Sequence, residues 1–298
     1  MTIPTFSTLL QQLINGISIG SVYALMAVGY SLVYSIMNFS NFAHGGVIML
    51  GAYFGFFALT MFNLPFPLAL LAATIIATIV AIMVERIAYN PLRQRNAPYL
   101  YFIISAMGMS IFLENLVIAT IGPNFKTYPK VFETKPIEFG DIALGRLDIT
   151  MLIISTVTLL ILLFIIERTK IGLAIRATAY NLRASALMGV NTDNIIFIVF
   201  GLGGAMAGIA GVLFGMKYTV YPQIGFITTK AFIAAVFGGL GSLAGAVIGA
   251  ILLGVIETIV AGVFGLSQYR DLFAFAILIL VLVIRPMGIM GKKSEDKA

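Results

Sequence analysis

Long apolar stretches make up most of the chain, and their length constrains its fold more than any other feature. A helix that rises 1.5 Å per residue needs about 20 apolar residues to cross a bilayer. Stretches of this size are predicted to span the membrane at roughly 9–34, 40–62, 66–88, 98–121, 149–167, 194–217 and 270–286. Together with the longer stretch 228–264, they predict an all-α polytopic membrane protein, a bundle of eight or nine transmembrane helices.

The stretch 228–264 is too long for one helix and too short for two full spans. Its GGLGS segment at 238–242 predicts a turn between a half-helix and a full helix. A break at membrane depth is tolerated only where it faces protein or water. We therefore expect one or more broken helices. Whether the number of spans is even or odd stays open.

The composition excludes several classes of protein. Charged residues make up 10% of the 298 residues, whereas a soluble domain carries about 25%. A soluble enzyme, a nucleic-acid-binding protein and a disordered chain are therefore excluded. The absence of cysteine and the single histidine argue against disulfides and metal clusters. Residues 1–12 contain no Lys or Arg, so the first span is predicted to be retained rather than cleaved as a signal.

Basic residues gather in loops 85–98 and 167–193 and in the C-terminal tail, which carry eleven of the 18 Lys and Arg residues. They are Arg86, Arg93, Arg95, Arg168, Lys170, Arg176, Arg183, Arg285, Lys292, Lys293 and Lys297. Because basic loops stay on the cytoplasmic side, we predict all three segments to be cytoplasmic. Loop 122–149 balances acidic and basic residues and contains three prolines. It is predicted to lie outside and to hold short strands or irregular structure.

No catalytic motif is present in the sequence. There is no phosphate-binding GxxxxGK[ST], no GxSxG, no HExxH and no paired His or Cys ligands. We therefore predict a chain that is not an enzyme and that needs no cofactor or metal. Its source of energy is expected to lie in other chains.

Residues 173–188 (LAIRATAYNLRASALM) in the second basic loop are rich in helix formers and predict a short amphipathic helix. One apolar face holds Leu173, Ala177, Tyr180, Ala184 and Leu187, while Arg176 and Arg183 share a neighbouring face. Gly189 is predicted to terminate the helix in the left-handed conformation. A helix this short needs a partner to be stable. From the residues alone, that partner is either a groove on another protein or the lipid headgroups.

Polar residues within the apolar stretches are candidates for the substrate pathway, since they are costly in lipid. They are Ser21, Tyr23, Asn38, Asn41, His44, Glu114, Asn115 and Glu257. For the two Glu residues the alternative is a hydrogen bond that ties helices together. For Asn38 and Asn41 it is helix capping, and for His44 it is packing with a satisfied imidazole.

Glycines four residues apart predict close approach of helix backbones. The residues in this pattern are Gly204 and Gly208, Gly211 and Gly215, and Gly241, Gly245 and Gly249.

Several long segments resemble the permease subunits of bacterial ABC importers in the branched-chain amino acid (LivH-type) family. They are LINGISIGSVYALMAVGYSLVYSIMNF at the first span, NFSNFAHGGVIMLGAY at 38–53, GLAIRATAYNLRASALMGVN at 172–191 and AVFGGLGSLAGAVIGAILLGVIE at 235–257. The resemblance covers nearly the whole chain. The combination of these segments is specific for the family, although each Gly-rich segment alone is a weak indicator.

The resemblance implies a single permease domain over 1–298, with 167–193 as a cytoplasmic coupling loop. The expected partners are a second permease (another copy or a related chain), two cytoplasmic ATPase subunits, an external substrate-binding protein and the lipid bilayer, with no nucleic acid. The residues implied to couple to the ATPase are Arg176, Ala177, Tyr180, Arg183, Ala184, Leu187, Met188 and Gly189.

The expected function is import of branched-chain amino acids across the bacterial inner membrane. Alternatives are a permease for urea or short-chain amides, an ATP-independent secondary transporter or channel, and a purely structural membrane subunit.

Overall fold

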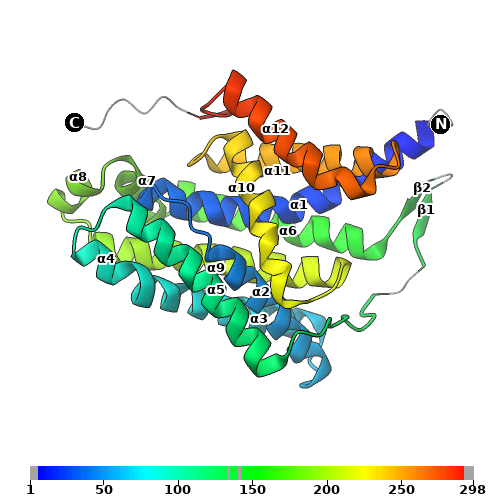
Figure 1. The fold of residues 1–298 in the computed structure, drawn as a ribbon, viewed down its shortest axis with the longest axis horizontal. Coiled ribbons are helices and arrows are strands. Elements are labelled where there is room, and N and C mark those ends of the chain that lie inside the picture. Colours follow the sequence, from blue (N-terminus) through cyan, green and yellow to red (C-terminus); the bar gives the residue numbers. More distant parts are fainter. Residues whose placement is uncertain (1–5, 133–134, 140–141, 292–298) are drawn as a thin grey trace. The chain divides into compact units, whose positions relative to one another are not determined.

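The computed structural model describes residues 6–132, 135–139 and 142–291, and helices dominate it (Figure 1). Among these residues, seven helical stretches are long and apolar enough to cross a membrane. They are Phe6–Met37, Phe66–Gln94, Tyr99–Ile121, Arg146–Arg168, Thr192–Lys217, Leu243–Gly262 and Ser267–Ile284. An eighth apolar helix, His44–Thr60, is shorter. The chain is thus an all-α, multi-pass membrane protein, as predicted, and the expected count of eight or nine spans is approximate.

The described chain packs into two compact units, each built from separated stretches of sequence. The first unit comprises Met1–Val28, Lys130–Thr156 and Thr229–Ala298, and the second comprises Gly29–Pro129 and Val157–Thr228. Helices α1 (Phe6–Met37) and α6 (Arg146–Arg168) contribute residues to both.

In the second unit, α2 (His44–Thr60), α3 (Phe66–Val84) and α9 (Thr192–Lys217) pack against one another as its core (Figure 1). Helix α3 continues through the π-helical turn η1 (Glu85–Tyr89) into α4 (Asn90–Gln94). Helix α5 (Tyr99–Ile121) starts after Pro98 and ends at Gly122, which has a φ of 96°. The 3₁₀ turn η2 (Pro222–Ile227) contacts α2 and α5.

The loop predicted as one helix over 173–188 forms two helices, α7 (Lys170–Tyr180) and α8 (Leu182–Leu187). The single-helix prediction was wrong because Asn181 is extended, with φ −154° and ψ 108°, and its side chain accepts a hydrogen bond from the Ala184 N–H. An Asn that caps the next helix competes with continuation of the previous one. Gly189 adopts a φ of 86°, as its place after the helix predicts.

In the first unit, the predicted break in 228–264 is confirmed. Helix α10 (Thr228–Gly238) is a half-helix, and α11 (Leu243–Gly262) is a full span that Ser242 caps. Gly241 has a φ of 83° in the turn between them, so its predicted place on one helical stripe with Gly245 and Gly249 was wrong. The N–H groups of Ile289 and Met290 donate to the Phe237 and Gly238 carbonyls at the end of α10.

Helix α12 (Arg270–Ile284), preceded by the short turn η3 (Ser267–Tyr269), packs along α11. The predicted strands in loop 122–149 are present: β1 (Ile137–Phe139) pairs antiparallel with β2 (Ile142–Leu144). The Gln11 side chain exchanges two hydrogen bonds with the Ala143 backbone and so ties this hairpin to α1. The cytoplasmic placement of the basic segments stays a prediction, and Lys292, Lys293 and Lys297 lie outside the described residues.

Candidate functional site

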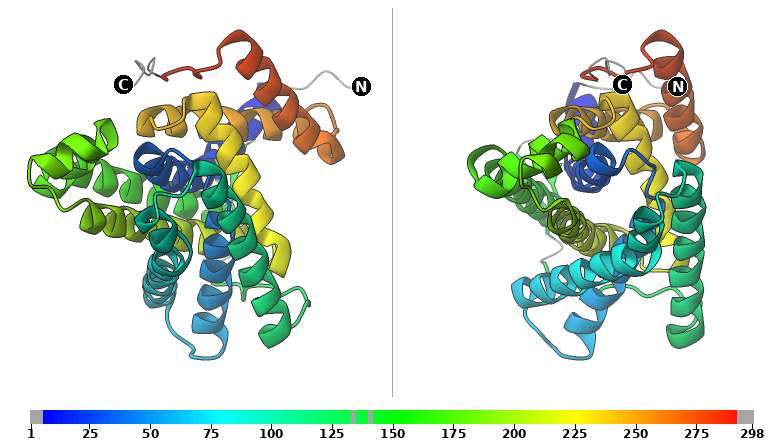
Figure 2. Two further views of the ribbon diagram at one scale, coloured as in Figure 1. Left: turned by 60° about the vertical axis from the view of Figure 1, so that its left-hand side comes forward. Right: turned by 90° about the vertical axis from the view of Figure 1, so that its left-hand side faces the viewer.

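Helices α7 and α8 (light green in Figure 2) project from the rest of their unit and expose large apolar side chains. Tyr180 is 82% exposed, Leu187 88% and Met188 86%. The opposite side of the pair supplies the buried residues Ile175, Thr178 and Ser185. The apolar exposed side therefore contributes nothing to the core of this unit. We call it the α7–α8 surface: Leu173, Ala177, Tyr180, Ala184, Leu187 and Met188.

The other coupling candidates lie around this surface. The Arg176 guanidinium donates to the Ile166 carbonyl at the end of α6, where four carbonyls lack helical partners. Arg183 is exposed on α8, and Gly189 is exposed just beyond it. A helix C-terminus attracts positive charge, so Arg176 also stabilises the end of α6.

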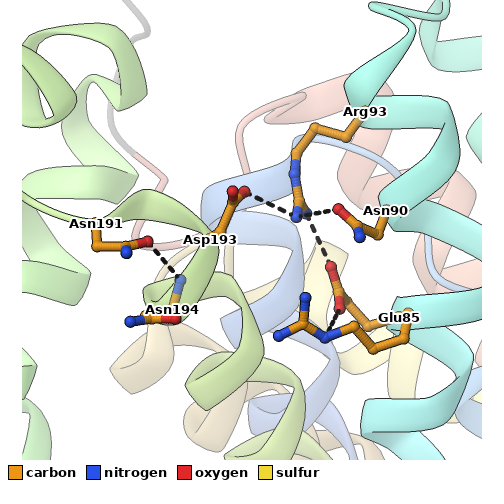
Figure 3. Close-up of polar contacts among 7 residues, drawn as sticks. Glu85, Asn90, Arg93, Asn191, Asp193 and Asn194 are labelled. Atoms are coloured by element: carbon orange, nitrogen blue, oxygen red, sulfur yellow. Dashed lines mark hydrogen bonds and ion pairs between the residues drawn. The ribbon is translucent and has the colours of Figure 1, made fainter.

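A polar cluster lies where the two basic loops meet (Figure 3). Arg93 reaches Glu85 with one terminal nitrogen, at 3.0 Å, and Asp193 with the other, at 3.0 Å. The second nitrogen also donates to Asn90 Oδ1 at 2.9 Å. Arg86 adds a longer contact to Glu85, at 3.7 Å. The cluster thus links the segment after α3 to the first turn of α9.

A second polar group lies in the turn that joins α1 to α2. The buried Tyr89 hydroxyl donates to Asn41 Oδ1 at 2.7 Å. The buried His44 ring meets the Tyr30 ring edge-on, with centroids 6.3 Å apart. Asn41 and His44 line a small pocket together with Val33, Val47, Ala81 and Phe200. Asn41 is therefore bonded to a neighbouring segment rather than capping a helix, in contrast to Asn38, which ends α1 with a φ of 54°.

The remaining candidates of this group are dispersed. Ser21 is buried and donates to the Ser18 carbonyl within α1. Glu114 is half-buried on α5, and no ion pair of its side chain occurs among the described residues. Asn115 is exposed and donates to the Ile111 carbonyl one turn earlier. The structure does not bring Glu114 and Asn115 together with the Asn41–His44 pocket.

Glu257 is buried in α11 and has two partners. The Tyr23 hydroxyl donates to Oε2 at 3.0 Å, and the Lys230 ammonium lies 2.9 Å from Oε1. Lys230 also reaches the exposed Asp271 at 3.0 Å and lies over the Tyr23 ring, 5.8 Å from its centroid. The carboxylate therefore holds α1, α10 and α11 together. This arrangement corresponds to the alternative in which Glu257 ties helices, through an ion pair as well as a hydrogen bond.

The glycines on α9 lie at close helix contacts. A Cβ added to Gly204 would lie 2.5 Å from the Ala81 Cβ, and one on Gly208 2.8 Å from the Ala77 Cβ, both on α3. At Gly211 it would lie 2.2 Å from the Ile48 carbonyl oxygen on α2. Gly215 contacts Tyr128 and Val220, and Gly245 and Gly249 lie against α10.

Sequence reasoning missed Arg93, Asp193, Tyr89 and Lys230 as site residues. Two signals were present. Glu85 is the one acid in a basic loop, and a buried acid needs a cation close by. Lys230 begins an otherwise apolar stretch that also contains Glu257. Neither signal identifies the full set of partners, because Arg93 and Asp193 are separated by 100 positions and Lys230 and Glu257 by 27.

Comparison with known proteins gives one consistent result. The family model for the branched-chain amino acid transport system permease component matches residues 12–282. The high-affinity branched-chain amino acid transport system permease protein BraD of Pseudomonas aeruginosa is 44% identical over 97% of both chains. The LivH permease protein of Escherichia coli is 40% identical over 98% of both.

The chain also shares its fold with a solved structure. That structure is PsaBC from Streptococcus pneumoniae in complex with Fab, with a TM-score of 0.51, 14% identity, and coverage of 95% of this chain and 94% of that one.

Proposed function

Because the chain belongs to the family of permease components of branched-chain amino acid transport systems, we propose that it is the membrane-spanning subunit of an ABC importer for these amino acids. A binding protein outside the cell delivers the substrate, and separate ATPase subunits on the cytoplasmic side drive its passage. A second permease, identical or related, completes the pore in the inner membrane.

The observation that carries this proposal is the α7–α8 surface. Tyr180, Leu187 and Met188 expose apolar side chains on a short helical pair that also carries Arg176 and Arg183. Helical pairs of this kind bind by laying an apolar face into a groove. In the proposed complex this groove belongs to an ATPase subunit, and Ala177, Ala184 and Gly189 allow the close approach.

The polar residues Asn41 and His44 of the second unit fit a passage that binds its substrate weakly. Asn41 and His44 line a small pocket whose other walls are apolar. A permease that receives substrate from a binding protein needs few contacts of its own, because it must release what it admits. Glu257, whose two oxygens are engaged by Tyr23 and Lys230, is better placed to hold helices than to bind substrate.

Reconstitution tests the proposal. The chain would be co-expressed with the permease, ATPase and binding-protein chains encoded beside its gene, and placed in proteoliposomes with radiolabelled leucine. We expect leucine uptake to require both ATP and the binding protein. Unlabelled isoleucine and valine should inhibit this uptake by competition. Uptake without ATPase chains would point to a secondary carrier. Competition by urea or acetamide in place of valine would point to an amide permease.

A further inference from the structure

Arg93 holds two carboxylates that differ sharply in burial. The Glu85 side chain is 1% exposed, whereas the Asp193 side chain is 65% exposed, and each lies 3.0 Å from a different terminal nitrogen of Arg93. The planar guanidinium presents its donors in a fixed fork, so both carboxylates are held at once. Figure 3 shows Arg93 between them.

The two contacts differ in how easily they break. Removing the cation from a buried carboxylate is strongly unfavourable, because an uncompensated charge stays in the interior. An exposed ion pair contributes little, since water solvates both groups when they separate. Arg93 therefore stays on Glu85, while its contact with Asp193 opens and closes at low cost.

Asp193 lies close to the α7–α8 surface along the chain. It belongs to the first turn of α9, which Asn191 caps through the Asn194 N–H. Only Met188–Thr192 separate it from the end of α8. A displacement of α8 therefore reaches Asp193 through a few residues.

Glu85 connects Arg93 with the turn between α1 and α2. It is the first residue of η1, and the last residue of that turn, Tyr89, donates to Asn41 in the turn 38–43. Single π-helical turns within α-helices occur frequently at functional sites. Asp193, Arg93, Glu85, η1, Tyr89 and Asn41 thus form a continuous physical connection.

We infer that Arg93 is a positioning residue whose exchangeable contact with Asp193 couples the α7–α8 surface to the polar turn 38–43. The inference rests on the proposed function, since it assumes that a partner moves α8. When α8 moves, Asp193 leaves or regains Arg93, and η1 with its Tyr89–Asn41 bond responds. Either arrangement of this contact keeps Glu85 neutralised.

The test uses the reconstituted complex and measures leucine transported per ATP hydrolysed. Asp193→Asn removes the exchangeable charge and leaves Glu85–Arg93 intact. Arg93→Lys keeps a cation for Glu85 but loses the fork that reaches Asp193. We expect each variant to bind the ATPase subunits normally and to lower this ratio by about threefold or more, within the range of mutations in coupling networks.

The double variant separates coupling from independent effects. If the two residues act through one contact, Arg93→Lys with Asp193→Asn lowers the ratio no further than either change alone. Asp193→Glu restores the charge and should recover the ratio. Arg95→Gln, which removes a charge from the same loop at an exposed position, is the matched control and should behave as wild type.

Three outcomes overturn the inference. An unchanged ratio in Asp193→Asn would show that the contact is only structural. Loss of ATPase binding in that variant would place Asp193 on the docking surface instead. Additive losses in the double variant would exclude a shared contact. Failure of the proposed function is distinct, because it appears as absence of ATP-dependent uptake in the wild type.

Discussion

The Lys230 ammonium lies 2.9 Å from the Glu257 carboxylate, so a buried charge on an apolar helix is neutralised by a cation from the neighbouring half-helix. Glu257 is buried on α11, and Lys230 lies near the start of α10. The pair therefore fixes a broken helix to a full span. A half-helix of 11 residues has little stability by itself, so such an anchor has a clear structural use.

We expect Glu257→Leu to lower the yield of folded protein strongly, because it removes the buried carboxylate partner of Lys230 and leaves the contact with the exposed Asp271. Breaking a buried pair by removing one partner costs about 3–5 kcal/mol. Glu257→Gln keeps an acceptor for the Tyr23 hydroxyl and should lower the yield of folded protein less. Thermal unfolding and size-exclusion profiles in detergent measure both.

The control for this prediction removes both charges. Lys230→Met combined with Glu257→Leu removes both charges of the buried pair, and the Asp271 that loses Lys230 is exposed to solvent. The double variant should therefore be more stable than Glu257→Leu alone. If Glu257→Gln folds normally yet abolishes uptake, the charge itself takes part in transport, and the structural account of Glu257 is wrong.

We expect Ala184→Glu to abolish ATPase association and uptake together, because it puts a charge into the proposed docking contact. Position 184 is three residues after the Asn181 cap, where Glu is favoured in a helix. Helix α8 should therefore persist. A pull-down of the ATPase subunits, with membrane insertion checked by immunoblot, measures the effect.

Gly189→Val tests the same surface through the backbone. A β-branched residue resists the φ of 86°, at a cost of order 1–3 kcal/mol. No atom lies within 4 Å of a Cβ added there, so the effect comes from backbone strain and not from a clash. If both variants retain ATPase binding and full uptake, the α7–α8 surface faces the lipid headgroups instead.

The orientation is testable because the chain contains no cysteine. Cysteines at Gln94 and Ala186, both exposed, should react with an impermeant thiol reagent only after the cells are permeabilised. A cysteine at Thr127, exposed in the predicted outer loop, should react in intact cells. Labelling of position 186 from outside would contradict both the topology and the docking proposal.

Close packing of α9 predicts that Gly211→Ala lowers the yield of folded protein, since the added methyl would lie 2.2 Å from the Ile48 carbonyl oxygen. Gly108→Ala on α5 is the matched control, because no atom lies within 4 Å of its added Cβ. It should leave the yield unchanged or raise it slightly through helix propensity. Equal effects at both positions would refute the packing account. Fluorescence-detected size exclusion provides the comparison.

The sequence predicted the elements whose signals are local. Apolar length located the spans within a few residues, as for 98–121 against α5 (Tyr99–Ile121). The GGLGS segment predicted the break before α11, and Gly189 predicted the end of α8. The single helix over 173–188 was wrong because the capping role of Asn181 outweighed the helix propensity of the alanines around it.

The sequence by itself determined that this chain is an all-helical membrane protein with one broken span and an exposed amphipathic loop, because hydropathy, helix termini and loop charge are local properties. Only the tertiary structure decided which polar residues meet. Arg93 with Asp193, Tyr89 with Asn41, and Lys230 with Glu257 are each separated by 27 or more positions. Their pairing depends on how the helices pack, and burial then requires that each charge find a partner.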